Sequence, residues 1–404
     1  MHQKLTWILL FFSIYANAQS IKSIQLRPLQ ENNYSAIVPL GTVLELSFDD
    51  LEADSKDYQY KIEHMTSDWK SSRLLSSQYI DGFDQNTIIN VNNSFNTLQN
   101  YTHYSVKIPN INTKITKSGN YLLSILDEYD EIVFTRRFVL YERTTTIGVS
   151  VIRSRITKTV NQQQTVQFSV NHPRLQINNP SQEIKVVILK NNNWNEKITG
   201  LQPQFYKKGQ LLYNYTNKTN FWGGNEYLNF DNKVIRNKSL HINRIEKKEV
   251  YNHYLYPFEV DKFREYKYNP DINGQFVIRT IEADDVNTEG DYAMMHFSLL
   301  VDKLIKEKEI YVYGAFNGFR LLAENQMFLD EKSGMYKVNF LLKQGFYNYN
   351  FATVNVDGKL DLSELNGTFY ETENQYTVIV YYKRFGDFYE RVIGVGTGFF
   401  NQNR

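Results

Sequence analysis

Adjacent carboxylates are the residues of this sequence whose type and spacing come nearest to acid–base chemistry. They occur as Asp49-Asp50 and Asp284-Asp285. Neighbouring side chains on an extended chain point to opposite faces, so each pair is poorly placed to act as a general acid and base. Because Asp49-Asp50 follows the alternating strand Val43 to Phe48, we expect a turn held by side-chain to backbone hydrogen bonds. A calcium ligand is the functional alternative, although no loop carries the regular spacing of acids typical of calcium sites.

Other catalytic and metal-binding patterns are missing from the sequence. There is no cysteine, which excludes a thiolate nucleophile and a sulfur-rich zinc site. No Gly-x-Ser-x-Gly motif occurs, and no two histidines stand four residues apart. Gly394, Gly396 and Gly398 precede two phenylalanines rather than a helix that could hold phosphate, so we expect a loose tail there. The sequence predicts no enzyme, no catalytic residue, no cofactor and no metal; a hydrolase alternative would depend on Asp49 or His64.

Aromatic side chains are the remaining candidates for function, because they can form a core, a protein interface or a platform for sugar rings. We expect core positions for at least half of Trp69, Trp194, Trp222 and the many tyrosines. The stretch 221–225 lies in a long insert, where a loop cannot bury every aromatic side chain. We therefore predict that a partner is bound by Phe221, Trp222, Gly223, Gly224 and Asn225.

The first residues have the pattern of a secretory signal peptide. Lys4 precedes an apolar run from Leu5 to Ile14, and Ala16-Asn17-Ala18 is a small-residue cleavage site. The run is too short to cross a bilayer, and no later stretch approaches the roughly 20 apolar residues of a spanning helix. The sequence predicts an exported protein, and the lack of cysteine excludes a lipid anchor at the cleavage site.

Composition indicates a sheet-rich protein with a net charge near zero. Lys and Arg number 45 against 44 Asp and Glu, so no strong field would attract nucleic acid or anionic lipid. The chain has 30 Tyr and 26 Phe with only 8 Pro, which favours sheets with aromatic packing. Apolar and polar residues alternate in runs such as Leu44 to Phe48 and Val166 to Val170, each typical of a strand with one buried face. We predict an all-β fold.

An internal repeat sets the expected number of domains. Gly-x-Tyr occurs at Gly119 to Tyr121, Gly290 to Tyr292 and Gly345 to Tyr347, each time before an alternating strand. In immunoglobulin-like sandwiches a tyrosine at the turn that enters the penultimate strand hydrogen-bonds back onto its own chain, and this turn is called a tyrosine corner. Three corners predict three consecutive immunoglobulin-like or early-set β-sandwich domains.

Polar linkers near Glu142 and Lys303 would separate these domains, and the segment 191–273 would add long loops or a hairpin layer to the middle one. The expected boundaries are a signal peptide over 1–18, sandwiches over 19–142, 143–303 and 304–396, and a tail over 397–404.

Seven short stretches between Ile21 and about Tyr141 carry a family resemblance. They are Phe48 to Leu51, Tyr60 to His64, Ser67 to Trp69, Tyr79 to Phe83, Ser94 to Thr97, Tyr101 to Tyr104 and Ser118 to Tyr121. In these stretches the N-terminal domain resembles that of the plug protein family of the bacterial type IX secretion system. Glu371 to Asn374 and Val378 to Tyr382 are also similar to the family.

This resemblance implies a periplasmic protein at the inner face of the outer membrane. Such a protein closes the periplasmic opening of a large outer-membrane β-barrel translocon and has no active site. We expect a monomer that binds this protein partner, binds no nucleic acid and does not insert into the membrane.

A second resemblance concerns the last domain. Tyr311 to Phe319 is similar to the opening strand and turn of early-set sandwiches that accompany starch and glycogen enzymes. Phe319 stands where that family has a sugar-stacking tryptophan, and a turn with a core Phe is the alternative. The rival function is therefore a glycan-binding module of an outer-membrane uptake system, for which Trp222 would be a stacking residue.

Overall fold

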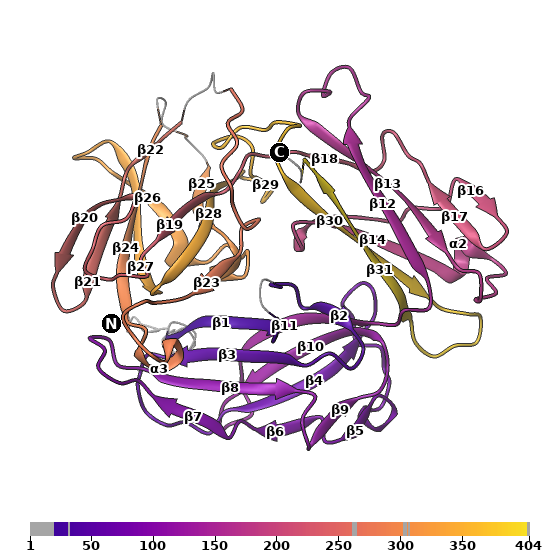
Figure 1. Cartoon of the computed structure of the whole chain (residues 1–404), viewed down its shortest axis with the longest axis horizontal. Helices are drawn as coiled ribbons and strands as arrows, with labels where there is room; N and C mark the ends of the chain where they lie inside the picture. Colours follow the sequence, from indigo (N-terminus) through magenta and orange to yellow (C-terminus); the bar gives the residue numbers. More distant parts are fainter. Residues whose placement is uncertain (1–19, 31–32, 261–264, 302–304, 306–307, 402–404) are drawn as a thin grey trace, which may run out of the picture.

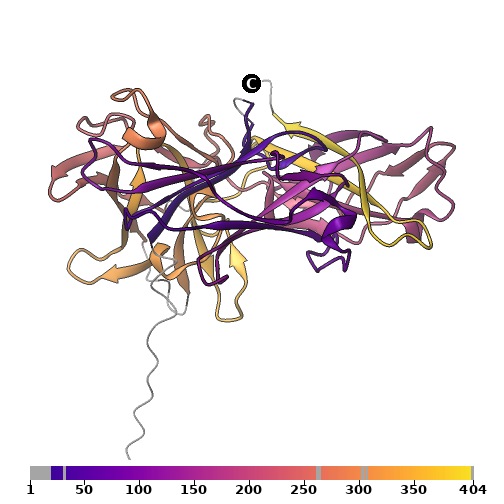
Figure 2. The same cartoon turned by 90° about the horizontal axis from the view of Figure 1, so that it is seen from below.

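The computed structural model describes residues 20–30, 33–260, 265–301, 305 and 308–401. The expected signal peptide and most of the linker near Lys303 lie outside them. The described chain forms three lobes of β-sheet that meet as the corners of a triangle (Figure 1). Viewed from below, the lobe formed by residues 20–141 (lobe 1) lies in front of the other two (Figure 2). No helix among the described residues is long and apolar enough to span a membrane.

Lobe 1 (residues 20–141) is a sandwich of two sheets. The first sheet has the order β1 (Ile21–Pro28), β3 (Leu44–Asp50), β8 (Thr102–Ile108), β7 (Asn90–Asn93). The second has the order β2 (Ile37–Pro39), β11 (Ile132–Tyr141), β10 (Gly119–Leu126), β4 (Gln59–Met65), β6 (Gln85–Thr87), and β5 (Ile80–Gly82) pairs with β9 (Thr113–Ile115) beside them. The alternating residues Leu44, Leu46 and Phe48 are buried between the sheets, as predicted.

Lobe 2 is a sandwich made from two separate segments of the chain. One sheet contains β12 (Thr146–Arg153), β13 (Gln163–Asn171), β17 (Gln210–Tyr213), β16 (Phe205–Lys207) and β18 (Asn220–Trp222). The other has the order β15 (Asn193–Thr199), β14 (Ile184–Lys190), β30 (Asn374–Tyr382), β31 (Arg391–Phe400). The C-terminal hairpin β30–β31 thus completes a sandwich that begins at residue 146.

Lobe 3 (residues 228–361) is inserted between these two segments. Its eleven-stranded sheet contains β19 (Leu228–Asp231), β20 (Ile242–Lys247), β21 (Tyr251–Leu255), β22 (Phe258–Glu259), β23 (Phe276–Ile278), β24 (Tyr292–Leu300), β25 (Glu309–Tyr313), β26 (Gln326–Asp330), β27 (Met335–Lys343), β28 (Gly345–Val354) and β29 (Leu360–Asp361). Phe297 of β24 and Tyr349 of β28 pack edge to face at 5.1 Å between ring centroids. Both residues belong to the main hydrophobic core of lobe 3. The single-turn helices are α2 (Pro180–Glu183), α3 (Val286–Glu289), η1 (Ser76–Gln78), η2 (Ala315–Asn317) and η3 (Ala323–Asn325).

The all-β sandwich class is confirmed, but the strand pairing departs from the expected domain boundaries. The sandwiches are not consecutive, because Ile188 of β14 pairs with Val378 of β30 across the whole of lobe 3. The boundary near residue 303 falls inside lobe 3, and the segment 304–396 is divided between lobes 3 and 2. Alternation identifies a strand by its buried face but contains no information about its neighbour in the sheet, so sequence order was a poor guide here.

The expected loose tail is also wrong, since Gly394, Gly396 and Gly398 lie in β31. A Cβ at Gly396 would stand 2.6 Å from Cβ of Ile147, and one at Gly398 would stand 2.6 Å from Cγ1 of Val149. The glycines therefore allow β31 to lie directly against β12, so that the two sheets of lobe 2 meet at this edge.

Of the Gly-x-Tyr motifs named above, two form the predicted corner. The Tyr121 hydroxyl donates to the Lys117 carbonyl at 2.8 Å, and the Tyr347 hydroxyl donates to the Lys343 carbonyl at 2.7 Å. The Tyr292 hydroxyl instead donates at 2.7 Å to Asp49 of lobe 1. The third motif is therefore used at a junction between lobes.

Replacing Tyr121 with Phe is expected to destabilise the protein by about 1 kcal/mol, because a buried carbonyl loses its donor while ring packing is kept. Urea denaturation measures this difference. Tyr129→Phe is the control, since Tyr129 is 76% exposed; equal stability of the two variants would contradict the corner's role.

Candidate functional site

Asp49 lies at the buried junction of lobes 1 and 3. It stands near the end of β3, where strand pairing places it opposite His103 of β8. Its Oδ1 is 2.6 Å from His103 Nδ1, and its Oδ2 accepts hydrogen bonds from Lys343 Nζ at 2.8 Å and from Tyr292 at 2.7 Å. Burial alone would raise the pKa of the Asp49 carboxyl, but Lys343 and His103 offset this and hold that pKa below its usual value. A buried ion network therefore joins the two lobes.

The expected turn explains Asp50 but not Asp49. Asp50 accepts a hydrogen bond from the Glu52 backbone N–H at 3.1 Å, as predicted for a turn, whereas Asp49 is wholly buried among charged partners. The Asp49–His103 pair has the geometry of the acid–base half of a hydrolase triad. In the described part of the chain no hydroxyl nucleophile hydrogen-bonds to His103, and His64 lies elsewhere, against Tyr121. The arrangement fits a structural clamp better than a catalytic site.

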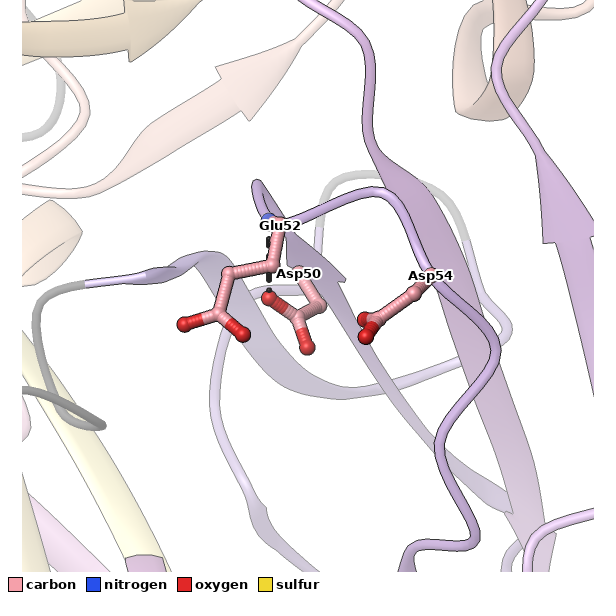
Figure 3. Close-up of side chains that lie close together, drawn as sticks. All are labelled: Asp50, Glu52 and Asp54. Atoms are coloured by element: carbon pink, nitrogen blue, oxygen red, sulfur yellow. Dashed lines mark hydrogen bonds between the residues drawn. The ribbon is translucent and has the colours of Figure 1, made fainter.

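Three carboxylates gather in the loop after β3 (Figure 3). One oxygen from each of Asp50, Glu52 and Asp54 lies within 4.8 Å of the others. Lys56 Nζ lies 2.8 Å from Asp50 and 3.7 Å from Asp54, and it also contacts Glu52. Burial would lower the pKa of Lys56, but its bonds to Asp50 and Glu52 raise it overall. The single ammonium group neutralises one of the three negative charges and occupies the space between the carboxylates where a calcium ion would have to bind.

Polar and aromatic contacts fasten lobe 1 to lobe 2. The Ser67 backbone N–H donates to Glu390 at 2.7 Å, and the Tyr381 hydroxyl donates to Asn120 at 2.8 Å. Trp69 and Trp194 pack edge to face at 4.8 Å between ring centroids. Two of the three tryptophans considered above are therefore partly buried partners of each other at this junction.

His64 is buried in lobe 1 against Tyr121 and Tyr389. A Cβ at Gly119 would collide with its ring, so the glycine of the corner motif also makes room for the imidazole. Burial lowers the pKa of His64 to about 4 from its ordinary value of 6.5, although its bond to the Ser118 carbonyl acts in the opposite direction.

We expect His64 to make the protein less stable as pH falls from about 6.5 to about 4. In this window the unfolded chain binds a proton at the imidazole and the folded chain does not, so acid favours unfolding. Urea denaturation at pH 7 and pH 4.5 should show a smaller loss of stability for His64→Gln than for the wild type. His241→Gln should retain the wild-type loss; the same loss in His64→Gln would contradict the expectation.

The comparisons with known proteins agree with this architecture. The sequence pattern of a family described as "Type 9 secretion system plug protein 1st domain" matches residues 21–142, which is lobe 1. Lobe 1 therefore belongs to the family of type IX secretion system plug protein first domains. The match confirms the resemblance seen in the sequence and suggests a non-enzymatic protein associated with the cell envelope.

The chain is also similar to a solved structure over nearly its whole length. That structure is titled "Crystal structure of a hypothetical protein from Parabacteroides merdae ATCC 43184 at 2.30 A resolution". The identity is 30%, the TM-score is 0.90, and the match covers 94% of this chain and 97% of that chain. None of the curated proteins matches the chain.

The predicted partner-binding stretch 221–225 lies outside the matched domain and connects lobe 2 to lobe 3. Phe221 is buried, and a Cβ at Gly223 would collide with the Phe369 carbonyl. The Gly224 backbone N–H donates to Thr368 at 3.0 Å, and Asn225 donates to the Asn366 carbonyl at 2.9 Å. Only Trp222 presents a large exposed side chain, 49% of it accessible. Binding through these residues stays a prediction, and within the stretch it would depend on Trp222.

Sequence reasoning missed the residues that join the lobes. Lys343 and Asp49 come from strands of different lobes, and neither position is marked by period-two alternation. One local indication existed at Arg136, which occupies a core-facing position between Phe134 and Phe138 of β11. A charged residue in a series of core-facing positions is unusual, because charged side chains are seldom buried without a partner.

Proposed function

We propose that this protein is the periplasmic plug that closes the periplasmic opening of the outer-membrane translocon of the type IX secretion system, acting by binding and without catalysis. The observation that carries the proposal is the family match over lobe 1 together with its setting in a clamped, three-lobed body. The partner is the β-barrel translocon, and neither nucleic acid nor membrane insertion is involved.

The clamped body suits the task of blocking a wide, water-filled pore. Each lobe contacts both others: Asp49 joins lobe 1 to lobe 3, and Glu390 joins lobe 2 to lobe 1. The triangle closes where Asn193 of lobe 2 donates to the Tyr313 hydroxyl of lobe 3 at 3.0 Å. Buried polar contacts of this kind resist relative motion of domains. With a formal net charge of +1, the plug would dock by shape and local contacts rather than by a long-range field.

Deleting the gene tests the proposal. The mutant should become permeable to large solutes while the translocon still assembles, and a plasmid copy of the gene should restore the barrier. Permeability equal to that of the parent strain, with an assembled translocon, would refute the gating role. Co-purification of the tagged protein with the barrel would identify the partner directly.

The glycan-binding rival receives less support from the geometry. Phe319, at the position of the early-set stacking residue, packs against Tyr313 at 5.4 Å between ring centroids. Its carbonyl accepts a hydrogen bond from Asn195 of lobe 2 at 2.8 Å. A sugar ring would have to displace a contact between lobes in order to stack there.

A further inference from the structure

Arg136 is a charged side chain in a position made for an apolar one. It points from β11 to the same side as Phe134 and Phe138, which are both core residues of lobe 1. Its one hydrogen bond in the described structure joins Nη1 to the neighbouring Thr135 carbonyl at 3.0 Å. Burial, with a smaller contribution from the charge of Arg320, lowers the pKa of the Arg136 guanidinium to about 10. A half-buried cation normally has an anionic partner, and in the described chain Arg136 forms no ion pair.

Two adjoining cavities open on either side of Arg136, where the lobes meet. One has a volume of about 180 Å³ and is lined by all three lobes, including Trp194 of lobe 2 and Phe319 of lobe 3. The other, of about 130 Å³, lies between lobes 1 and 3. Ile24, Arg136 and Phe276 line both.

The lining of these cavities is basic, although the whole chain is nearly neutral. Its charged residues are Lys22, Arg27, Arg136, Arg137, Arg320 and Glu324. The single acid, Glu324, is already paired with Lys22. Arg136 and Arg320 face the same cavity, and within the described residues neither has a carboxylate partner. The junction therefore has a local excess of positive charge that would attract an anion.

Size and walls restrict the kind of anion. Small-molecule pockets usually measure about 300–1,000 Å³, so each cavity better fits one inserted side chain than a free ligand. Phe276, Phe316 and Phe340 line the smaller cavity and favour an anion with apolar neighbours. Guanidinium groups bind carboxylates through paired hydrogen bonds. An acidic side chain flanked by aromatic residues on a partner protein matches the size of the cavity, its apolar walls and its guanidinium groups.

We propose that the smaller cavity, between lobes 1 and 3, binds a carboxylate side chain presented by a partner protein, with Arg136 and Arg320 as its ligands and the surrounding aromatic rings as its walls. The inference rests on the proposed function in that the partner would belong to the translocon or to the proteins that pass through it. A partner side chain bound there would contact lobes 1 and 3 at once, beside the larger cavity that all three lobes line.

Calorimetric titration of the purified protein tests this site. The probe is the peptide acetyl-Gly-Phe-Asp-Phe-Gly-amide, and its matched control has Asn in place of Asp. The Asp peptide should bind at least about tenfold more tightly than the Asn peptide, since a charge-assisted hydrogen bond is lost with the charge. Equal binding of the two peptides, or no binding of either, would overturn the proposal. Binding of inorganic phosphate in place of the peptides would overturn it in favour of a phosphate site.

Substitutions locate the binding. Arg136→Gln and Arg320→Gln should each weaken binding of the Asp peptide by about tenfold. Arg320 is exposed, so its variant decides the question should Arg136→Gln fail to fold. Arg155→Gln removes an exposed arginine of lobe 2 and should leave binding unchanged. An equal loss in Arg155→Gln, or full binding by Arg320→Gln, would refute the assignment. This titration is independent of the permeability assay, so failure of one does not imply failure of the other.

Discussion

Lys343→Met is expected to destabilise the protein by about 3–5 kcal/mol, because it removes the cation from a carboxylate that stays buried. Lys343 Nζ is 2.8 Å from Asp49, and both side chains are at most 2% exposed. Because the methionine fills most of the vacated volume, the loss of stability measures the effect of the missing charge rather than of lost packing. Urea denaturation followed by tryptophan fluorescence measures the change.

Two further variants separate this charge effect from the effect of substituting any lysine in β27. Lys337→Met removes a partly exposed lysine of the same strand, paired with Asp330, and should cost at most about 1 kcal/mol. Asp49→Asn combined with Lys343→Met should recover part of the lost stability, since no uncompensated charge is left. A double variant as unstable as the sum of the two single ones would contradict the ion-network explanation.

Gly396→Val is expected to destabilise the protein by about 3 kcal/mol, because the added side chain would overlap β12, where no space exists. A Cβ at this position would lie 2.7 Å from the Ile147 carbonyl oxygen, which is backbone and cannot rotate away. The two sheets of lobe 2 would have to separate along this edge. The midpoint of thermal unfolding should fall accordingly.

Thr397→Val is the matched control, since it places the same side chain on the exposed, opposite face of β31. Its stability should stay within about 0.5 kcal/mol of the wild type. Equal stability of the two valine variants would show that β31 does not approach β12 as closely as described.

The sequence was informative wherever the physical cause is local. Alternation at Leu44 to Phe48 predicted a strand with a buried face, and the Gly-x-Tyr motif predicted the corners at Tyr121 and Tyr347, because both effects act within a few residues. The turn at Asp50 was predictable for the same reason.

Features that depend on distant pairing were not predictable. Nothing near Asp49 indicates that Lys343 lies beside it, and nothing near Ile188 indicates that Val378 is its strand partner. The glycines of β31 precede two phenylalanines and no helix, which predicts a tail. Nothing near them indicates β12, the remote strand that they pack against, which begins at Thr146. Contacts between remote segments are fixed by the whole fold, so a single sequence contains no direct record of them.

The insertion of lobe 3 into lobe 2 gives the chain a compulsory order of assembly. When the chain enters a compartment from its N-terminus, lobe 1 can complete its sheets early, whereas β14 must wait for β30 until nearly all of the polypeptide has arrived. During that interval β14, rich in valine and isoleucine, is an unpaired edge that can bind other chains. A copy shortened before Asn374 would keep that edge permanently, so loss of the last strands should lead to aggregation rather than to a smaller soluble protein.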